Sequence, residues 1–166
     1  MAETRVLIPL NQSEMSKTIL PHVERHLPPG ANRLLLFYVA RPPKVIGLSA
    51  PEYDLGYGFG EVREIPEAGA HPIYSTQQED SIRANVETEM LPILERLEAQ
   101  GYQVALQVSF GEDVAAEILR AIQEQGIDLV AMSTRARDGL RRFFFGSIAL
   151  EVLQKAQVPL LLYHPH

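Results

Sequence analysis

The fold is decided by the stretch Val6-Leu7-Ile8-Pro9-Leu10-Asn11-Gln12-Ser13, in which a short apolar run gives way to turn residues. Continuous apolar runs of this length, bounded by turn residues, are typical of strands buried on both faces. Ser13 can accept a hydrogen bond at the start of a helix, which we expect to run from residue 14 to about residue 27. Pro21 lies inside that helix and is expected to kink it one residue earlier. The stretch therefore predicts a strand followed by a helix.

The same alternation continues along the rest of the chain. Further apolar runs predict four more strands, at Leu34–Val39, Val104–Val108, Leu129–Met132 and Val158–Leu162. Helical periodicity predicts three more helices: one over residues 82–97 with a bend or boundary at Pro92, one from residue 114 that ends at Gly126, and one that starts at Gly146-Ser147 and includes Leu153. Strict alternation implies right-handed crossovers and a parallel sheet covered on both faces. We expect one doubly wound α/β domain over residues 1–166, with five parallel strands and four helices, and a ligand site outside the carboxyl ends of the strands.

Composition and charge narrow the class of protein. The chain has 166 residues, a length typical of one domain, and a net charge of −6, whereas nucleic-acid binding needs a surplus of Lys and Arg. It has no cysteine, which removes disulfides, thiolate metal sites and cysteine nucleophiles. The longest apolar stretch, Leu34 to Ala40, is far shorter than the ~20 residues of a membrane span. We expect a soluble, cytoplasmic protein with no nucleic-acid or membrane partner.

One segment, residues 41–78, interrupts the alternation. It contains 5 of the 12 prolines and 5 of the 11 glycines, together with Tyr53, Tyr57, Phe59 and Tyr74. Loops of this length inside a compact domain are usually lids, binding loops or disordered segments. We expect a long Pro/Gly-rich insertion loop that packs on a ligand cleft, on a second subunit or on its own domain.

The segment from Ser133 to Ser147 carries the clearest binding signal. It begins at the carboxyl end of a predicted strand and finishes at a predicted helix start, where we expect Gly146 and Ser147 to offer free N–H groups. The segment adds four positive charges to an acidic chain, at Arg135, Arg137, Arg141 and Arg142. This pattern is compatible with a phosphate site and, equally, with a capped helix beside a solvated loop.

The remaining polar residues do not form a reactive group in the sequence. His22 and His26 are four residues apart on one predicted helix, a spacing that can bind a metal, but no third ligand is placed beside them. No nucleophile is paired with a base. We therefore expect no catalytic residue and no metal site.

These motifs resemble the universal stress protein family along the whole chain. Nucleotide-binding members carry Gly, two residues, Gly, nine residues and then Gly-Ser or Gly-Thr, and the matching positions here are Ser133, Ala136, Gly146 and Ser147. The opening strand is similar to the family's first strand, where proline and then Asp-x-Ser are usual. Similarity extends through Leu35–Val39, Gly111–Leu119, Ile127–Met132 and Val158–Leu162.

The resemblance implies a Rossmann-like domain, similar to the adenine nucleotide alpha hydrolases, that binds ATP and acts as a regulatory module in the stress response. Hydrolysis would be slow or absent, and Mg²⁺ would accompany the nucleotide rather than occupy a separate protein site. The chain would form a homodimer through its last strand, Val158 to Tyr163, which we expect at a sheet edge. The residues implied in nucleotide binding are Pro9, Leu10, Asn11, Val39, Met132, Ser133, Arg135, Ala136, Gly146, Ser147 and Ile148.

Two positions depart from the family pattern. Asn11 replaces the aspartate after the first strand, so a hydrogen-bonding side chain remains but its charge is lost. Ala136 replaces the second glycine, which costs on the order of 1 kcal/mol if that position needs a positive φ. These departures favour an alternative, an interaction protein that binds no nucleotide. A further alternative is an ATP-using enzyme of the same fold, with a substrate pocket supplied by residues 41–78.

Overall fold

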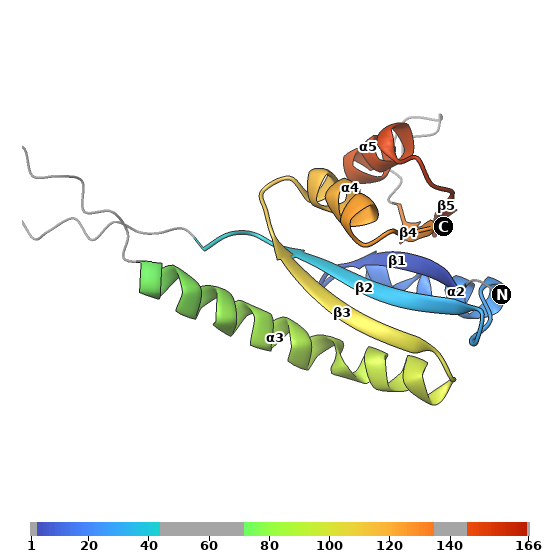
Figure 1. The fold of residues 1–166 in the computed structure, drawn as a ribbon, viewed down its shortest axis with the longest axis horizontal. Coiled ribbons are helices and arrows are strands. Elements are labelled where there is room, and N and C mark those ends of the chain that lie inside the picture. The colour runs from blue at the N-terminus through green and yellow to red at the C-terminus, as the bar shows by residue number, and fades with distance from the viewer. Residues whose placement is uncertain (1–2, 44–71, 135–145, 166) are drawn as a thin grey trace, which may run out of the picture.

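The computed structural model describes residues 3–43, 72–134 and 146–165, which form one parallel sheet with helices on both faces (Figure 1). The strand order is β3-β2-β1-β4-β5, so the chain runs outward from β1 in one direction and then returns to continue on its other side. This arrangement confirms the doubly wound α/β fold. The strands are β1 (Thr4–Leu10), β2 (Asn32–Ala40), β3 (Gln103–Phe110), β4 (Leu129–Ser133) and β5 (Leu160–Tyr163).

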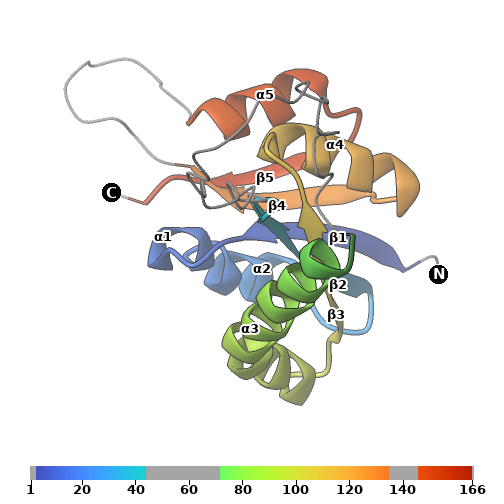
Figure 2. The same cartoon turned by 90° about the vertical axis from the view of Figure 1, so that its left-hand side faces the viewer.

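The helices divide between the two faces of the sheet. Figure 2 shows α4 and α5 above the sheet and α2 and α3 below it. The described residues contain no helix that is long and apolar enough to cross a membrane. The helices are α1 (Glu14–Lys17), α2 (Leu20–His26), α3 (Pro72–Ala99), α4 (Val114–Glu124) and α5 (Ser147–Lys155).

Each face of the sheet has its own hydrophobic core, because side chains alternate along every strand. On the face covered by α2 and α3, Ile8 and Leu36 pack with Met90 and Leu97, and all four are fully buried. The opposite core, below α4 and α5, is built from Leu7, Phe37, Ile118, Val130 and Val152. Burial on both faces explains why the strands read as continuous apolar runs.

The first predicted helix is wrong as a single element. The structure has two helices, because the chain leaves α1 at Thr18 and restarts at Leu20. The Thr18 hydroxyl donates to the carbonyl of Met15 at 2.6 Å, which ends α1 with a side-chain hydrogen bond. Pro21 lies in the first turn of α2, where a missing N–H costs no helical hydrogen bond. The proline therefore starts a helix instead of kinking one.

The predicted insertion loop is shorter than expected. Helix α3 begins at Pro72, so residues 72–78 are helical, and residues 44–71 lie outside the described residues. A proline at the first helical position is favourable, which explains this start. Pro92 marks no boundary, since it lies inside α3, which is 28 residues long and ends at Ala99. Burial of Met90 and Leu97 on either side holds the helix together despite the proline.

The sheet ends in two edge strands, β3 and β5, and the prediction of the last strand at an edge is confirmed. Strand β5 starts at Leu160, two residues later than predicted. The N–H of Val130 donates to the Pro159 carbonyl at 3.0 Å and that of Thr134 to Tyr163 at 2.9 Å. Peptide groups alternate in direction along a strand, so those of Leu160 and Leu162 face away from β4.

The edge of β3 is partly occupied by a side chain from α3. The N–H of Gly111 donates to Ala40 in β2, so by the same alternation the carbonyl of Val108 faces outward. Arg83 donates from Nη1 to that carbonyl at 3.3 Å, and its guanidinium lies 5.5 Å from the centre of the Phe110 ring. Among the described residues, no side chain covers the edge of β5 in this way. The open edge of the sheet is therefore β5.

Candidate functional site

The candidate site lies where the carboxyl ends of β1 and β4 meet. These strands are neighbours in the sheet, but β1 leads on to β2 on one side and β4 to β5 on the other. Such a reversal of strand order is the place where open α/β sheets bind ligands, because the connecting segments leave in opposite directions. We call this region the strand-end site and define it by Pro9, Asn11, Ser133, Thr134 and the start of α5.

The hydrogen-bonded pairing between β1 and β4 stops before either strand ends. Their pairing stops at Leu7 and Val130, although β4 continues to Ser133. The Arg5 carbonyl accepts a hydrogen bond from the N–H of Asp128, so odd-numbered residues of β1 direct their peptide groups toward β4. The next such residue is Pro9, which has no N–H to donate. Its position explains why the ladder between the two strands stops there, beside the strand-end site.

Asn11 fixes the turn that follows β1. Its Oδ1 accepts hydrogen bonds from the backbone N–H of Ser13 at 2.8 Å and from the Ser13 hydroxyl at 2.6 Å. Ser13 then caps α1 by accepting from the N–H of Ser16, and the Ser16 hydroxyl lies 3.0 Å from the backbone N of Asn11. These contacts form a closed set of local hydrogen bonds of the kind that Asn and Ser favour in turns. The end of β1 is therefore held in one conformation.

Two hydroxyl groups hold the end of β4. Ser133 Oγ lies 2.9 Å from Thr18 Oγ1 at the end of α1. The Thr18 proton is already donated to Met15, so Ser133 is the donor in this pair and keeps its lone pairs for another partner. The next residue, Thr134, is 4% exposed, and its Oγ1 accepts from the N–H of Gly146 at 3.1 Å. Thr134 thus joins the strand end to the start of α5.

That contact corrects one expectation about the helix start. The N–H of Gly146 is not free, because Thr134 accepts its hydrogen bond. The first N–H groups of α5 itself, at Ser147, Ile148 and Ala149, have no carbonyl partner in the helix, and Gly146 supplies no side-chain cap. In α4 the Asp113 side chain accepts from one of the corresponding N–H groups, that of Ala116. The start of α5 therefore retains donors and the positive end of the helix dipole.

Gly146 is not required by the fold. Its φ is −56°, which any residue can adopt, and an added Cβ would meet no atom of the described residues within 4 Å. The space beside it is open. A glycine in such a position leaves room for a ligand to approach the backbone.

The predicted nucleotide-binding residues fall into three groups. Asn11, Ser133, Gly146 and Ser147 lie at the strand-end site, with Ile148 39% exposed in the first turn of α5. Pro9, Val39 and Met132 lie on the sheet face below α4 and α5, whereas Leu10 is buried in the opposite core, so only its main chain is available. Arg135 and Ala136 lie outside the described residues.

Sequence reasoning missed Thr18 and Thr134. Both hydroxyls act as links between elements, and neither belongs to a motif with a fixed spacing. The available signal for Thr134 was a hydroxyl directly after a buried strand, where a polar group must find a partner. Thr18 carried no comparable signal, because its role depends on the unexpected end of α1.

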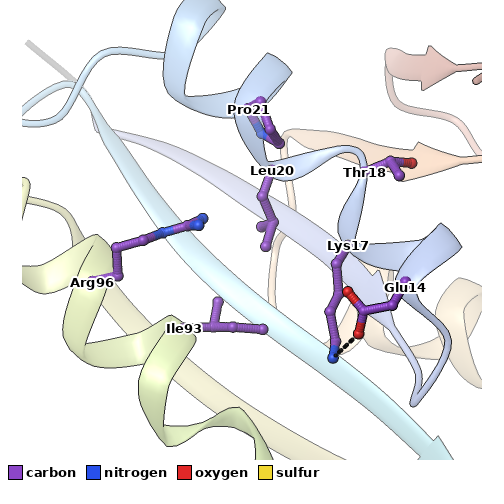
Figure 3. A pocket seen from close by; sticks show the side chains of 7 residues that line it. All are labelled: Glu14, Lys17, Thr18, Leu20, Pro21, Ile93 and Arg96. Atoms are coloured by element: carbon purple, nitrogen blue, oxygen red, sulfur yellow. Dashed lines mark hydrogen bonds and ion pairs between the residues drawn. The ribbon is translucent and has the colours of Figure 1, made fainter.

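A depression lies between α1–α2 and α3 (Figure 3), and Thr18, which is hydrogen-bonded to Ser133 of the strand-end site, is among the residues that line it. Its volume is about 340 Å³, with Leu20 and Ile93 among the residues that line it. Its two cationic side chains already have partners, since Lys17 is 2.9 Å from Glu14 and Arg96 is 2.6 Å from Glu24. Balanced charges of this kind offer little to an anionic ligand. We place the candidate site at the strand ends for that reason.

Both residues of the histidine pair lie on α2. His22 packs on Tyr163 of β5, with ring centroids 3.8 Å apart. Within the described residues there is no cluster of three or more side chains with the geometry to hold a metal ion.

At the carboxyl end of β2, burial raises the pKa of Tyr38, and the nearby Glu89 carboxylate adds to the effect.

The fold and the site together define a doubly wound α/β protein with a ligand site at the switch point between β1 and β4. The sequence model described as the universal stress protein family matches residues 4–164. The chain belongs to the universal stress protein family. No curated protein sequence matches it significantly.

Solved structures show the same fold at low identity. Hypothetical protein MJ0577 has a TM-score of 0.70 and 17% identity, with 100% of this chain and 99% of that chain covered. A universal stress protein in complex with cAMP has a TM-score of 0.53 and 15% identity, with 100% of both chains covered. A family protein from Arabidopsis thaliana with AMP bound gives 0.61 and 12%, covering 98% of this chain and 92% of that one.

The link between β4 and α5 can be tested with Thr134→Val, which keeps the shape of the side chain and removes the acceptor for Gly146. We expect a loss of about 1–2 kcal/mol in the free energy of unfolding, because a part-buried donor loses its partner. The control is Thr88→Val on the exposed face of α3, expected to cost less than about 0.5 kcal/mol. Urea denaturation measures both, and equal costs would contradict the assigned link.

Proposed function

We propose that this protein is a cytoplasmic regulatory module that binds ATP at the strand-end site, with Mg²⁺ arriving with the nucleotide. The observation that carries the proposal is the start of α5, where the first N–H groups have no helical partner and an added Cβ on Gly146 would meet no atom of the described residues within 4 Å. Donors at a helix start, together with the helix dipole, favour a phosphate group. In this proposal the protein acts by binding ATP and thereby changing its interaction with partners, and it does not act by hydrolysing the ATP.

The phosphate end of the site combines backbone and side-chain donors. Ser147 contributes an N–H and a hydroxyl, and Ile148 contributes a second N–H. The sequence between Ser133 and Gly146 contains four arginines, all of them outside the described residues. A cluster of positive charge in a chain of net charge −6 supports an anionic ligand over a neutral one.

The adenosine end would lie toward β2. Val39 and Met132 pack in the core below α4 and α5, and Pro9 shares their face of the sheet by alternation with Leu7. These side chains lie at the carboxyl ends of β2, β4 and β1, and they offer apolar surface to a base. Ser133 adds a hydroxyl whose lone pairs can accept from a ligand donor.

Two of the similar structures support adenine as the base. One is a universal stress protein in complex with cAMP and the other a family protein with AMP bound. At 15% and 12% identity these structures share the fold with this chain. The proposal that this chain binds ATP therefore rests on the N–H donors at the start of α5 and on the retained Gly146-Ser147 pair.

The second candidate is an interaction protein that binds no nucleotide. The observation that favours it is the state of Asn11, whose Oδ1 is already occupied by Ser13 and carries no charge. A ribose hydroxyl that needs an acceptor at this position would find none. Mass spectrometry of small molecules released from freshly purified protein separates the two candidates.

Ser147→Glu tests the phosphate end directly. A carboxylate at the first position of α5 should stabilise the helix and repel the phosphates. We therefore expect the free energy of unfolding to rise and the affinity for ATP to fall. We expect ATP affinity to fall by at least about 100-fold, measured by calorimetry. The matched control is Gln154→Glu near the other end of α5, with affinity within about threefold of the unmodified protein. Equal ATP affinity in the unmodified and Ser147→Glu proteins would place the phosphates elsewhere.

We also propose a homodimer through β5. The peptide groups of Leu160 and Leu162 face away from β4, and β5 is the edge that no side chain among the described residues covers. An open edge invites another strand, and pairing of β5 with its own copy around a two-fold axis would close the sheet. The side chains of β5 are half-buried and pack against both cores, so the contact would be made chiefly by the backbone.

Leu162→Pro removes an outward N–H and should give a monomer, while Leu162→Ala loses the side chain but keeps that donor and should remain a dimer. Sedimentation at micromolar concentration distinguishes the two states, with circular dichroism to establish that each variant is folded. A monomer for the unmodified protein would refute the proposed interface.

A further inference from the structure

Three of the four large apolar side chains that are exposed among the described residues lie on α5. They are Ile148, Leu150 and Leu153, and the fourth is Leu91 on α3. Leu150 and Leu153 are each 41% exposed and stand three residues apart, so they lie on the same side of the helix. We call these two residues the leucine flank. On a helix of only nine residues, such a pair is a surface that another protein can cover.

The neighbouring helix α4 shows which side of α5 this is. Helices α4 and α5 pack on the same face of the sheet and run in the same direction, because each leads from the carboxyl end of one parallel strand to the start of another. In α4, Glu117 comes directly before the buried Ile118, and its carboxylate accepts a hydrogen bond from Ser109 of β3. On this face, residues directly before a buried position are therefore turned toward β3, and residues directly after one are turned away from it, toward β5.

In α5 both exposed leucines come directly after a buried residue. Leu150 follows Ala149 and Leu153 follows Val152, and these two buried residues belong to the core below α4 and α5. By the geometry of α4, the leucine flank is turned toward β5. Figure 2 shows α5 at the β5 end of the molecule, opposite α3 and β3. The leucine flank therefore borders the open edge of the sheet.

None of the residues of α5 that share this side is charged. Glu151 comes directly before Val152 and is turned toward α4, and Lys155 donates to its carboxylate at 2.6 Å. The exposed residue that follows Leu153 is the neutral Gln154. Charged residues are depleted at the centres of protein interfaces, so the leucine flank fits an apolar partner surface.

Strand β5 alone is too small to hold two copies of the chain together. It has four residues, which span about 13 Å, whereas stable dimers bury about 1,200–2,000 Å² of surface. The side chains of β5 are half-buried against the cores of their own chain, so they add little to a contact with another copy. A dimer that pairs through β5 therefore needs further apolar surface beside that edge, and the leucine flank supplies it.

The spacing of strands and helices allows two copies of α5 to meet. Antiparallel pairing of β5 with its own copy extends the sheet without turning it over, so both α5 helices lie on the same face. Helix α5 packs over β4 and β5, so the two helices are two strand spacings apart, about 10 Å. This separation matches the usual distance between the axes of packed helices.

We propose that the leucine flank packs against the leucine flank of a second copy of this chain. This inference rests on the homodimer put forward in the proposed function: β5 provides the backbone part of the interface and α5 the side-chain part. A two-fold axis brings the same surface of both copies together, so Leu150 and Leu153 meet the same two residues of the other copy. Removal of these four leucines from water stabilises the dimer.

Leu153→Lys tests this contact because it places a charge in the leucine flank and leaves β5 unchanged. We expect the dissociation constant of the dimer to rise by at least about 100-fold, measured by sedimentation over a range of concentrations. The matched control is Leu91→Lys on the opposite face of the sheet, where Leu91 is 49% exposed. We expect the control to leave the dissociation constant within about threefold of that of the unmodified protein. Thermal melts establish that both variants are folded.

A second measurement uses the absence of cysteine from the chain. In a Leu150→Cys or Leu153→Cys variant, a short bis-maleimide can join cysteines only between two copies. We expect a covalent dimer from at least one of these variants and none from Leu91→Cys. The inference is overturned, and pairing through β5 retained, if Leu153→Lys leaves the dimer intact or if both variants cross-link no more than Leu91→Cys. A monomer for the unmodified protein would overturn the proposed homodimer, and this inference with it.

Discussion

The strand-end site depends on a hydrogen bond that β1 cannot make. Pairing between β1 and β4 stops at Leu7 and Val130, because Pro9, the next residue directed at β4, has no N–H. In the middle of a sheet such a proline is normally costly, and it is tolerated here where the two strands already approach their ends. The ladder therefore ends beside the polar residues that follow β1 and β4, at the point where strand order reverses. The missing hydrogen bond leaves the carboxyl ends of these two strands without further pairing at the candidate site.

The rim of that site is stabilised by short polar links rather than by apolar packing. Asn11 and Ser13 fix the turn after β1, Ser133 donates to Thr18, and Thr134 accepts from Gly146. Each link joins a strand end to a helix start or end, so the helices stay in register with the strands. A site held in one geometry loses less conformational entropy when a ligand binds. The N–H donors at the start of α5 then set which ligand groups are favoured.

The sequence was sufficient to predict a helix or strand where one local rule determined the structure of the segment. Five apolar runs predicted the five strands, and the periodic residues of α4 predicted that helix, because burial on fixed faces leaves a clear pattern. It was insufficient where two rules competed. Pro21 was interpreted as a kink because its helix was assumed to be continuous, whereas the Thr18 hydroxyl ends α1 first. The partner of Gly146 depends on Thr134, twelve residues away, which no spacing rule reveals.

The most direct test of the account is an amide NMR titration of the full chain with Mg²⁺–ATP. We expect the largest shift changes at the N–H groups of Ser147 and Ile148, at the start of α5, and at Asn11, directly after β1. Residues of the depression between α1–α2 and α3, such as Ile93 and Arg96, should shift little. Saturable changes centred on Ile93 and Arg96, with none at Ser147, would contradict the assignment of the strand-end site.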